Sequence, residues 1–418
     1  MKKILMLGGA YIQIPMIKAA REMGHYVITC DYLEDNPGHQ YAHEYHNVST
    51  TDKEGVLALA RSLKIDGIIC YASDPAAPTA AYVGEKLGLP SQPYESVEIL
   101  SHKDKFRAFL KQNGFHVPKA KGYDSLEAAR LDFHQYKMPV MIKPVDSSGS
   151  KGISKIDSIE YLQEKVEYAL SFSREKRFII EEYIEKNGSL VSGDGFSVDG
   201  ELVFRSFANT NFPLSDFNPF VPIGSSWPYN MPKHIQNKIH AEIQRLLRLL
   251  HMKTGAYNLE VIVDEQENIF LIEIAARNGG EWVAQATKYA TGVDLIEYTI
   301  RAALGEDCSD LKMVETKGFW GMYIINSQQT GILKEISIHE EFEKNHIVEC
   351  ELIVKPGDVI TALTGAHQKI GIMILKFSSM NEMLEKMENI TDWVQVIVEE
   401  LDCQDELNKK KTYRQILK

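Results

Sequence analysis

The stretch "MPVMIKPVDSSGSKGISKI", Met138 to Ile156, ends an apolar run with a lysine and continues at once into a loop rich in glycine and serine. The apolar run predicts a buried strand, and a buried ammonium group is costly unless an anion meets it. The loop Asp146–Gly152 offers backbone N–H groups to the same anion. In a P-loop the lysine follows the glycines, whereas Lys143 precedes them, so a different phosphate-binding arrangement is indicated.

The composition of the 418-residue chain is that of a globular enzyme with two to four domains, with 44% apolar and 25% charged residues. A net charge of -12 argues against nucleic acid as a main partner, because phosphate-backbone binding needs clustered Lys and Arg. The five cysteines lie far apart without a CxxC pair, which is typical of reduced thiols. The sequence shows neither a cleavage site after its apolar N-terminal run nor a membrane-spanning run, so we expect a cytoplasmic protein.

Residues 1–100 alternate between strand and helix signals. The stretches "KKILMLG", "HYVITCD" and "IDGIICYA" are short and apolar, and helical patterns cover about 14–24, 52–64 and 75–87. This alternation predicts a parallel α/β sheet. Gly8-Gly9 follows the first strand without GxGxxG spacing, so we interpret it as a tight turn and not a dinucleotide site.

The rest of the chain divides into three further parts. An amphipathic helix, the glycine-rich loop and the strand "RFIIEEYI" define 101–185, and a β-rich region with a helix at 233–251 defines 186–305. An α+β region covers 306–418, and its end, "ELNKKKTYRQILK", is predicted to be a solvated tail. We therefore predict four parts, 1–100, 101–185, 186–305 and 306–418.

The strands "AYNLEVIVD" and "NIFLIEIAA" carry one glutamate each. If "EQEN" is the turn and Asp264 lies opposite Ile269, antiparallel register places Glu260 directly across from Glu273. Two facing carboxylates need a shared proton or a cation. Oxygen ligands without nearby Cys or His indicate Mg²⁺. The alternative is a wrongly assigned hairpin with two unrelated glutamates.

Basic residues accompany these features. Lys103 and Arg107 are four residues apart and so share one face of a helix, although an ordinary solvated face would have the same pattern. Lys143 also has an alternative interpretation, a strand-end lysine whose ammonium group reaches solvent.

The order of these features resembles the ATP-grasp superfamily of carboxylate–amine ligases. A lysine comes first, followed by a lysine before a glycine-rich loop, then "IIEEYI", and then a Glu/Glu hairpin ending in "EIAARNGG". The resemblance covers nearly the whole chain and is greatest to the stand-alone L-amino acid (dipeptide) ligases. It implies an α/β fold in which a parallel preATP-grasp domain precedes ATP-grasp α+β domains and a small C-terminal α+β region.

The resemblance also implies ATP and Mg²⁺ as cofactors, with Mn²⁺ as a substitute, and a set of site residues. In that set the catalytic residues are Arg277 and Lys143, and the metal ligands are Glu260 and Glu273. Adenine is contacted by the Glu181 side chain and by the backbone of Glu182 and Ile184, beside Tyr183. The residues that bind the phosphates are Lys103, Lys143, Ser148, Gly149 and Ser150.

Two positions depart from the family pattern. Leu190 stands where many members carry a glutamate for the ribose hydroxyls, and Ala275 stands where many carry a metal-binding asparagine. In the register above, Asn258 lies opposite Ala275, so we predict that Asn258, or a water that it holds, completes the metal shell. Asn278 is the rival candidate.

The function implied by the resemblance is ATP-dependent ligation. A small carboxylate, expected to be an amino acid, is activated as an acyl phosphate and attacked by an amine, which gives an amide or dipeptide. Two alternatives remain, a purine-pathway ribotide ligase or carboxylase and a nucleotide-binding regulatory protein. We expect a homodimer with small-molecule substrates only, and we assign the aromatic- and proline-rich segment Phe207–Pro232 to substrate recognition, its alternative being a well-packed surface loop.

Overall fold

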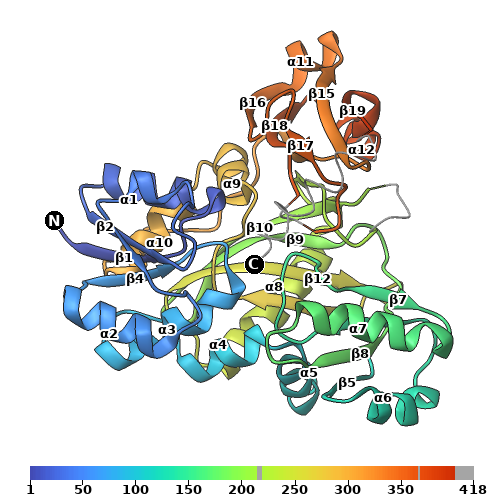
Figure 1. Cartoon of the computed structure of the whole chain (residues 1–418), viewed down its shortest axis with the longest axis horizontal. Helices are drawn as coiled ribbons and strands as arrows, with labels where there is room; N and C mark the ends of the chain where they lie inside the picture. The colour runs from blue at the N-terminus through green and yellow to red at the C-terminus, as the bar shows by residue number, and fades with distance from the viewer. Residues whose placement is uncertain (214–218, 366–367, 401–418) are drawn as a thin grey trace. The chain divides into compact units, whose positions relative to one another are not determined.

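The computed structural model of the chain describes residues 1–213, 219–365 and 368–400 (Figure 1). It forms two compact units, one of Met1–Thr210 with Trp227–Lys317 and one of Asn211–Ser226 with Gly318–Lys418. The four-part division expected from the sequence is finer than these two units and stays a prediction. Among the described residues, no helix is both long enough and apolar enough to cross a bilayer.

The first unit begins with the predicted parallel sheet, which has the strand order β3-β2-β1-β4. Its strands are β1 Lys3–Leu7, β2 Tyr26–Asp31, β3 Glu44–Asn47 and β4 Gly67–Cys70. The sequence did not predict β3, because "EYHN" is a short polar strand without the apolar signal of the other three.

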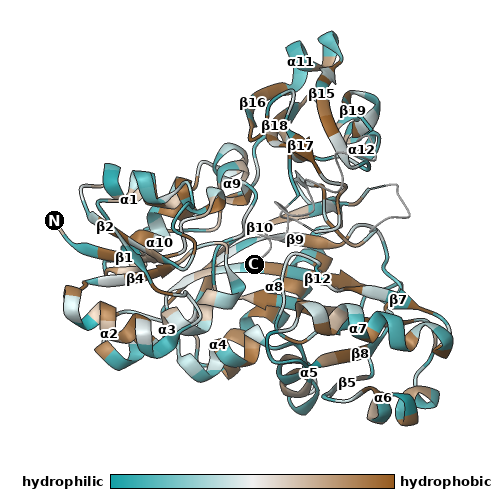
Figure 2. Ribbon diagram, in the orientation of Figure 1, coloured by the Kyte–Doolittle hydropathy of each residue, from teal (hydrophilic) through white to brown (hydrophobic). Residues whose placement is uncertain are grey.

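Helices cover both faces of this sheet (Figures 1 and 2). Leu5 and Leu7 of β1 pack with apolar residues of α2 Lys53–Leu63 and α3 Ala77–Leu87. Ile4 and Met6 of the same strand pack with α1 Ile14–Glu22 and α10 Leu295–Ala303. Since successive side chains point to opposite faces, this strand must be apolar throughout, as "ILML" is.

A second, antiparallel sheet has the order β5-β8-β6-β7. Its strands are β5 Ala120–Tyr123, β6 Val140–Pro144, β7 Ser154–Ile156 and β8 Phe178–Glu182, and its helices are α6 Leu126–Asp132 and α7 Leu162–Phe172. Ile142 and Ile180 are buried in the core that this sheet forms with its helices. The next side chains along each strand, Lys143 and Glu181, therefore point to the opposite face. Helices α4 Tyr94–Ser101 and α5 Lys103–Gln112 precede this sheet.

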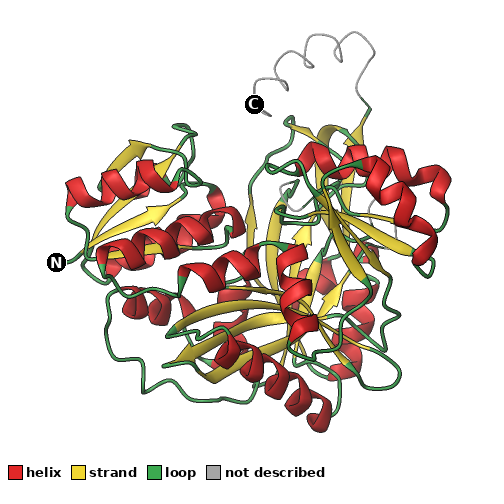
Figure 3. Cartoon of the chain, turned by 90° about the horizontal axis from the view of Figure 1, so that it is seen from below, coloured by secondary structure: helices red, strands yellow, loops and turns green. Residues whose placement is uncertain are grey.

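The third sheet of this unit has the order β13-β12-β9-β10 and carries the predicted glutamate hairpin. Figure 3 distinguishes the strands, in yellow, from the helices, in red. Its strands are β9 Val191–Val198, β10 Glu201–Asn211, β12 Gly255–Val263 and β13 Ile269–Ala275. Helix α8 Lys233–Leu249 packs on it through buried isoleucines and leucines, and α9 Val283–Thr291 follows the hairpin.

The second unit is α+β, as predicted. Strands β11 Gly224–Trp227, β14 Phe319–Ile325, β18 Gly371–Phe377 and β16 Ile347–Leu352 neighbour one another in that order. A smaller sheet has the order β17-β15-β19, formed by β15 Gly331–Ile338, β17 Val359–Ile360 and β19 Val394–Glu399. The helices are α11 Glu340–His346 and α12 Met380–Glu388.

Short 3-10 helices and the cysteines complete the description. The 3-10 helices are η1 Tyr11–Gln13, η2 His39–Tyr41, η3 Asp74–Ala76, η4 Phe133–Gln135, η5 Ile159–Tyr161 and η6 Ile390–Asp392. Cys30, Cys70, Cys308 and Cys350 are free thiols, as expected. Cys403 and the predicted tail 406–418 lie outside the described residues.

Candidate active site

The hairpin of β12 and β13 places its two glutamates opposite each other, although the turn differs from the prediction. Val263, and not Asp264, pairs with Ile269, and a bulge next to Glu260 then shifts the register by one residue. Beyond the bulge Glu260 pairs with Glu273, and Asn258 pairs with Ala275. The predicted pairing of the glutamates is therefore confirmed, while the predicted turn register is wrong.

The electrostatics of this pair favour a cation. Burial and the facing carboxylate of Glu273 raise the pKa of Glu260 to about 7. The Nζ of Lys103 lies 3.7 Å from Glu273 Oε2, which offsets only part of the negative charge. Within the described ranges no three His, Cys, Asp or Glu side chains form a metal-binding group, so a metal here would rely on two carboxylates and neutral or phosphate oxygens. That donor set fits Mg²⁺.

Asn258, the predicted third ligand, is held by a buried carboxylate. Its Nδ2 donates to the Gly193 carbonyl at 3.1 Å and to Asp194 Oδ1 at 3.0 Å. The backbone N–H of Gly279 donates to the same carboxylate at 2.9 Å. Burial raises the pKa of Asp194 to about 6. With its amide hydrogens engaged in this way, the carboxamide oxygen of Asn258 is the atom left to face a metal, and its role as a ligand stays a prediction.

Lys143 meets an anion, as the buried position of a lysine requires. Its Nζ forms an ion pair with Glu181 Oε1, and Arg107 Nε donates to Glu181 Oε2 at 2.8 Å. Although burial opposes it, Arg107 and Lys143 lower the pKa of Glu181 to about 2, so the carboxylate is ionised. The Glu181 side chain, predicted to contact adenine, is thus engaged by two cations in this structure.

Lys103 joins the glycine-rich loop to the glutamate hairpin. Its Nζ donates to the Ser147 carbonyl at 2.7 Å, and its backbone N–H donates to the Val145 carbonyl at 2.9 Å. The same ammonium lies near Glu273, so the first predicted phosphate ligand stands between the loop and the predicted metal site.

The first residue of the loop is anchored through its side chain. The Asp146 carboxylate accepts hydrogen bonds from Ser173 Oγ at 2.7 Å and from the Arg174 and Glu175 N–H groups at 3.0 and 3.1 Å. Beyond it, positive φ values occur at Gly149 (66°), Ser150 (57°) and Gly152 (75°). Gly152 has little room for a side chain, because a Cβ there would lie 3.1 Å from Phe172. Ser148, Gly149 and Ser150 are exposed or half-buried, as contact with a ligand requires.

In the predicted adenine segment, the backbone hydrogen bonds to other described residues end before Ile184. Glu182 N donates to the Lys119 carbonyl at 2.9 Å, and Tyr183 N donates to the Pro139 carbonyl at 3.0 Å. The next residue, Ile184, has neither its N–H nor its C=O hydrogen-bonded to another described residue. Tyr183 lies under the Lys155 ammonium, 3.8 Å from the ring centre. A free peptide group at a strand end suits the edge of a purine base.

Arg277 is positioned by a carboxylate from the N-terminal sheet. Its Nε and Nη2 donate to Asp74 Oδ1 and Oδ2 at 2.8 and 2.6 Å, and its Nη1 donates to the Asn278 carbonyl at 3.0 Å. Burial opposes ionisation, but Arg277 lowers the pKa of Asp74, so the pair is charged. This use of one edge of the planar guanidinium leaves hydrogens of Nη1 and Nη2 for a second anion.

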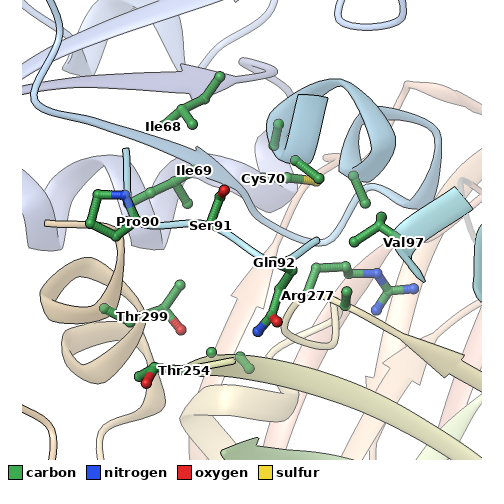
Figure 4. Close-up of a pocket in the computed structure, with 18 residues that line it drawn as sticks. Ile68, Ile69, Cys70, Pro90, Ser91, Gln92, Val97, Thr254, Arg277 and Thr299 are labelled. Carbon is green, nitrogen blue, oxygen red and sulfur yellow. The ribbon is translucent and has the colours of Figure 1, made fainter. Parts of the chain in front are cut away.

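Two cavities lie beside this pair. A pocket of about 30 Å³ is lined by Asp74, Lys103, Ser147 and Glu273 among others, so it brings together the loop, the metal hairpin and the N-terminal sheet. A cavity of about 90 Å³ is lined by Arg277 itself, with Cys70 and Gln92 also in its wall (Figure 4). The first of these is lined by one predicted phosphate ligand, Lys103, and one predicted metal ligand, Glu273.

Sequence reasoning missed Asp74 and Asp194. Asp74 follows β4 closely, and the carboxyl end of a parallel strand is where ligand-binding residues gather, so its position was a usable signal. Asp194 carried no such signal, because "VSGDGF" gives no indication of a fully buried carboxylate. Leu190, at the expected ribose position, is a buried apolar residue.

A family model described as an ATP-grasp domain matches residues 136–286. The chain carries an ATP-grasp domain. This match covers the glycine-rich loop, the adenine segment and the glutamate hairpin. The expected resemblance to the ATP-grasp superfamily, the fold class and the enzyme class, an ATP-grasp carbon–nitrogen ligase, are confirmed, and ATP with Mg²⁺ is the cofactor pair of this family.

Individual relatives are distant. The chain is 22% identical to formate-dependent phosphoribosylglycinamide formyltransferase of Prochlorococcus marinus (strain NATL2A), over 95% of this chain and 99% of that protein. Among solved structures, L-amino acid ligase from Bacillus licheniformis matches with a TM-score of 0.78 and 21% identity, covering 96% of this chain and 99% of that one. Phosphoribosylglycinamide synthetase from Anaerococcus prevotii matches with a TM-score of 0.73 and 20% identity, covering 95% and 100%. At these identities the structural matches establish the fold.

Proposed function

We propose that this ATP-grasp ligase activates a small carboxylate, an amino acid in the first instance, and joins it to an amine. In the first step a carboxylate oxygen attacks the γ-phosphorus of ATP, and ADP leaves. In the second step the amine nitrogen attacks the acyl carbon, phosphate leaves, and an amide or dipeptide forms. The observation that carries the proposal is that Lys103, Glu273 and Asp74, which is the ion-pair partner of Arg277, line one pocket.

The roles follow from charge and geometry. Lys103 and Lys143 would bind the phosphates, under a lid that includes Ser148, Gly149 and Ser150. Glu260, Glu273 and Asn258 would hold Mg²⁺, which would neutralise charge on the phosphate oxygens. The free edge of Arg277 would bind the transferred phosphoryl group, since a planar fork suits that geometry. All of this is positioning and charge stabilisation, which is what phosphoryl transfer requires.

A second candidate is a purine-pathway ligase acting on a ribotide. It is favoured by the 22% identity to a formate-dependent formyltransferase over almost the full length of both chains. The amino-acid ligase is favoured by the higher TM-score of its structure, 0.78 against 0.73 for the ribotide synthetase. The homodimer, the cytoplasmic location and the substrate-recognition role of Phe207–Pro232 stay predictions, and residues 214–218 of that segment lie outside the described ranges.

The test measures ADP release with three substrate sets: pairs of amino acids, phosphoribosylglycinamide with formate, and ATP alone. Products are identified by mass spectrometry, and a first half-reaction with carboxylate alone is detected by positional exchange of ¹⁸O in ATP. We expect amine-dependent turnover with an amino-acid pair. Turnover with phosphoribosylglycinamide and formate, but with no amino-acid pair, would establish the second candidate. Nucleotide binding without turnover on any of the three sets would support a regulatory protein. Glu273→Gln should be inactive, whereas Glu265→Gln, an exposed glutamate in the same hairpin, is the matched control.

A further inference from the structure

Arg107 has no role in the phosphate and metal contacts described above, yet it is among the most buried charged residues of the chain, with 4% of its surface exposed. It lies on α5, one turn after Lys103. Its Nε donates to Glu181 Oε2 at 2.8 Å, and its Nη1 donates to the Ile272 carbonyl at 2.9 Å and more weakly to the Leu271 carbonyl at 3.4 Å. One guanidinium therefore connects the adenine strand β8 to the metal strand β13.

Glu181 is paired with more positive charge than it carries negative charge. Its carboxylate meets Arg107 through one oxygen and Lys143 through the other. The exposed side-chain fractions are 4% for Arg107, 3% for Glu181 and 12% for Lys143, so solvent screens this group weakly. Two cations and one anion leave one net positive charge, and Lys143 is the more exposed of the two cations.

Removal of Arg107 would change what Lys143 offers to a phosphate. Glu181 and Lys143 alone form a neutral pair, and an approaching polyanion would then meet a carboxylate as well as an ammonium group. With Arg107 present, the carboxylate is already matched, so the positive charge of Lys143 remains available. The two strand carbonyls explain why an arginine occupies this position, because a single ammonium group cannot reach a carboxylate and two carbonyls in one plane.

We propose that Arg107 is a positioning residue for the nucleotide phosphates. It neutralises and orients Glu181, so that Glu181 does not cancel the positive charge that Lys143 presents to the triphosphate. The inference rests on the proposed ATP site, and it adds a residue that does not itself touch the nucleotide. A purely structural role, in which Arg107 only ties α5 to β8 and β13, is the competing explanation.

The two explanations differ in the effect of a second substitution. Arg107→Met leaves the neutral Lys143–Glu181 pair, whereas Arg107→Met with Glu181→Gln restores one free positive charge at Lys143. The charge-balance role predicts that the second substitution repairs phosphate binding. The structural role predicts that the second substitution does not repair phosphate binding, because both variants lack the hydrogen bonds of Arg107 to β8 and β13.

The experiment measures the affinities of ATP and of adenosine for the full chain by calorimetry, and uses their ratio as the readout. The ratio removes any effect of Glu181 on the base itself. We expect Arg107→Met to lower the ratio by about tenfold to a hundredfold, the usual range for a lost charged contact. The double variant should recover at least tenfold, Glu181→Gln alone should keep or raise the ratio, and Lys111→Met, an exposed cation on the same helix, should leave it unchanged.

The outcomes separate the proposals. If wild type binds neither ATP nor adenosine, the proposed function fails, independently of Arg107. If wild type binds ATP but Arg107→Met weakens ATP and adenosine equally, or the double variant shows no recovery, the charge-balance role is wrong. Should Arg107→Met fail to fold, Glu181→Gln still decides: a fall in its ATP-to-adenosine ratio would overturn the proposal.

Discussion

The facing glutamates make metal binding depend on pH, with a size that follows from Glu260. Burial and Glu273 raise the pKa of Glu260 from 4.5 to about 7, which corresponds to about 3 kcal/mol for ionising this group. Mg²⁺ must displace the proton, because a carboxylate binds metal only when it is ionised. With a pKa of about 7, roughly nine tenths of the molecules carry the proton at pH 6 and roughly one tenth at pH 8. The affinity for Mg²⁺ should therefore be about tenfold weaker at pH 6 than at pH 8.

The assay is a metal titration by calorimetry at pH 6 and pH 8, in two buffers whose ionisation enthalpies differ. The difference between buffers counts the protons released, which we expect to be about one at pH 6 and close to zero at pH 8. Protons released by groups other than Glu260 contribute equally to wild type and to Glu260→Gln. The difference between the two proteins is therefore the proton release that belongs to the Glu260 carboxyl group. Glu265→Gln is the exposed control.

Glu260→Gln should bind metal more weakly and lose the excess proton release. Equal affinity of the wild type for Mg²⁺ at the two pH values, or the same proton release in Glu260→Gln, would refute the shared proton.

The free energy of unfolding of the metal-free protein gives a second readout. Because the folded-state pKa is raised, the contribution of Glu260 to the free energy of unfolding is full below about pH 4.5 and is lost as pH rises to about 7. Glu260→Gln should flatten that part of the profile.

Four further outcomes are expected. Lys143→Ala should lower kcat/KM for ATP by about a hundredfold with the fold retained by circular dichroism, since it removes a cation aimed at phosphate; normal turnover would contradict this. Hydrogen exchange at 148–152 should slow when a non-hydrolysable ATP analogue binds, because these residues lie beyond Asp146 and Ser147, which are hydrogen-bonded to Ser173 and Lys103; equal protection in both states would argue against a lid. Asn258→Leu should weaken the dependence on Mg²⁺ more than nucleotide binding, and a metal titration identical to wild type would remove it from the site. Asp74→Ala should reduce the free energy of unfolding by about 3 kcal/mol and lower kcat more than it raises KM for ATP, because it leaves Arg277 buried and unpaired; an unchanged kcat would show that the pair is only structural.

Local patterns in the sequence were sufficient for the elements and for part of the site. Apolar runs and helical periodicity predicted the parallel N-terminal sheet, and an apolar run ending in Lys143 predicted its strand and the loop after it. The pairing of Glu260 with Glu273 was predicted from a turn placed one residue away from its true position, and the bulge beside Glu260 restored the expected pairing. These features depend on neighbours within about 15 residues, where side-chain alternation and turn chemistry determine the geometry.

The tertiary structure alone decided which charges meet. Asp74 and Arg277 are 203 residues apart, and Arg107 and Glu181 are 74 apart. No periodicity relates such residues, since their contact depends on how separate sheets and helices pack. A buried charge is stable only when it is paired, so the packing that buries Arg107, Arg277 and Asp194 also dictates their partners. The sequence by itself determined the strands and loops that carry the predicted ligands, and the packing of distant elements determined the carboxylates that hold the two arginines and Asn258 in position.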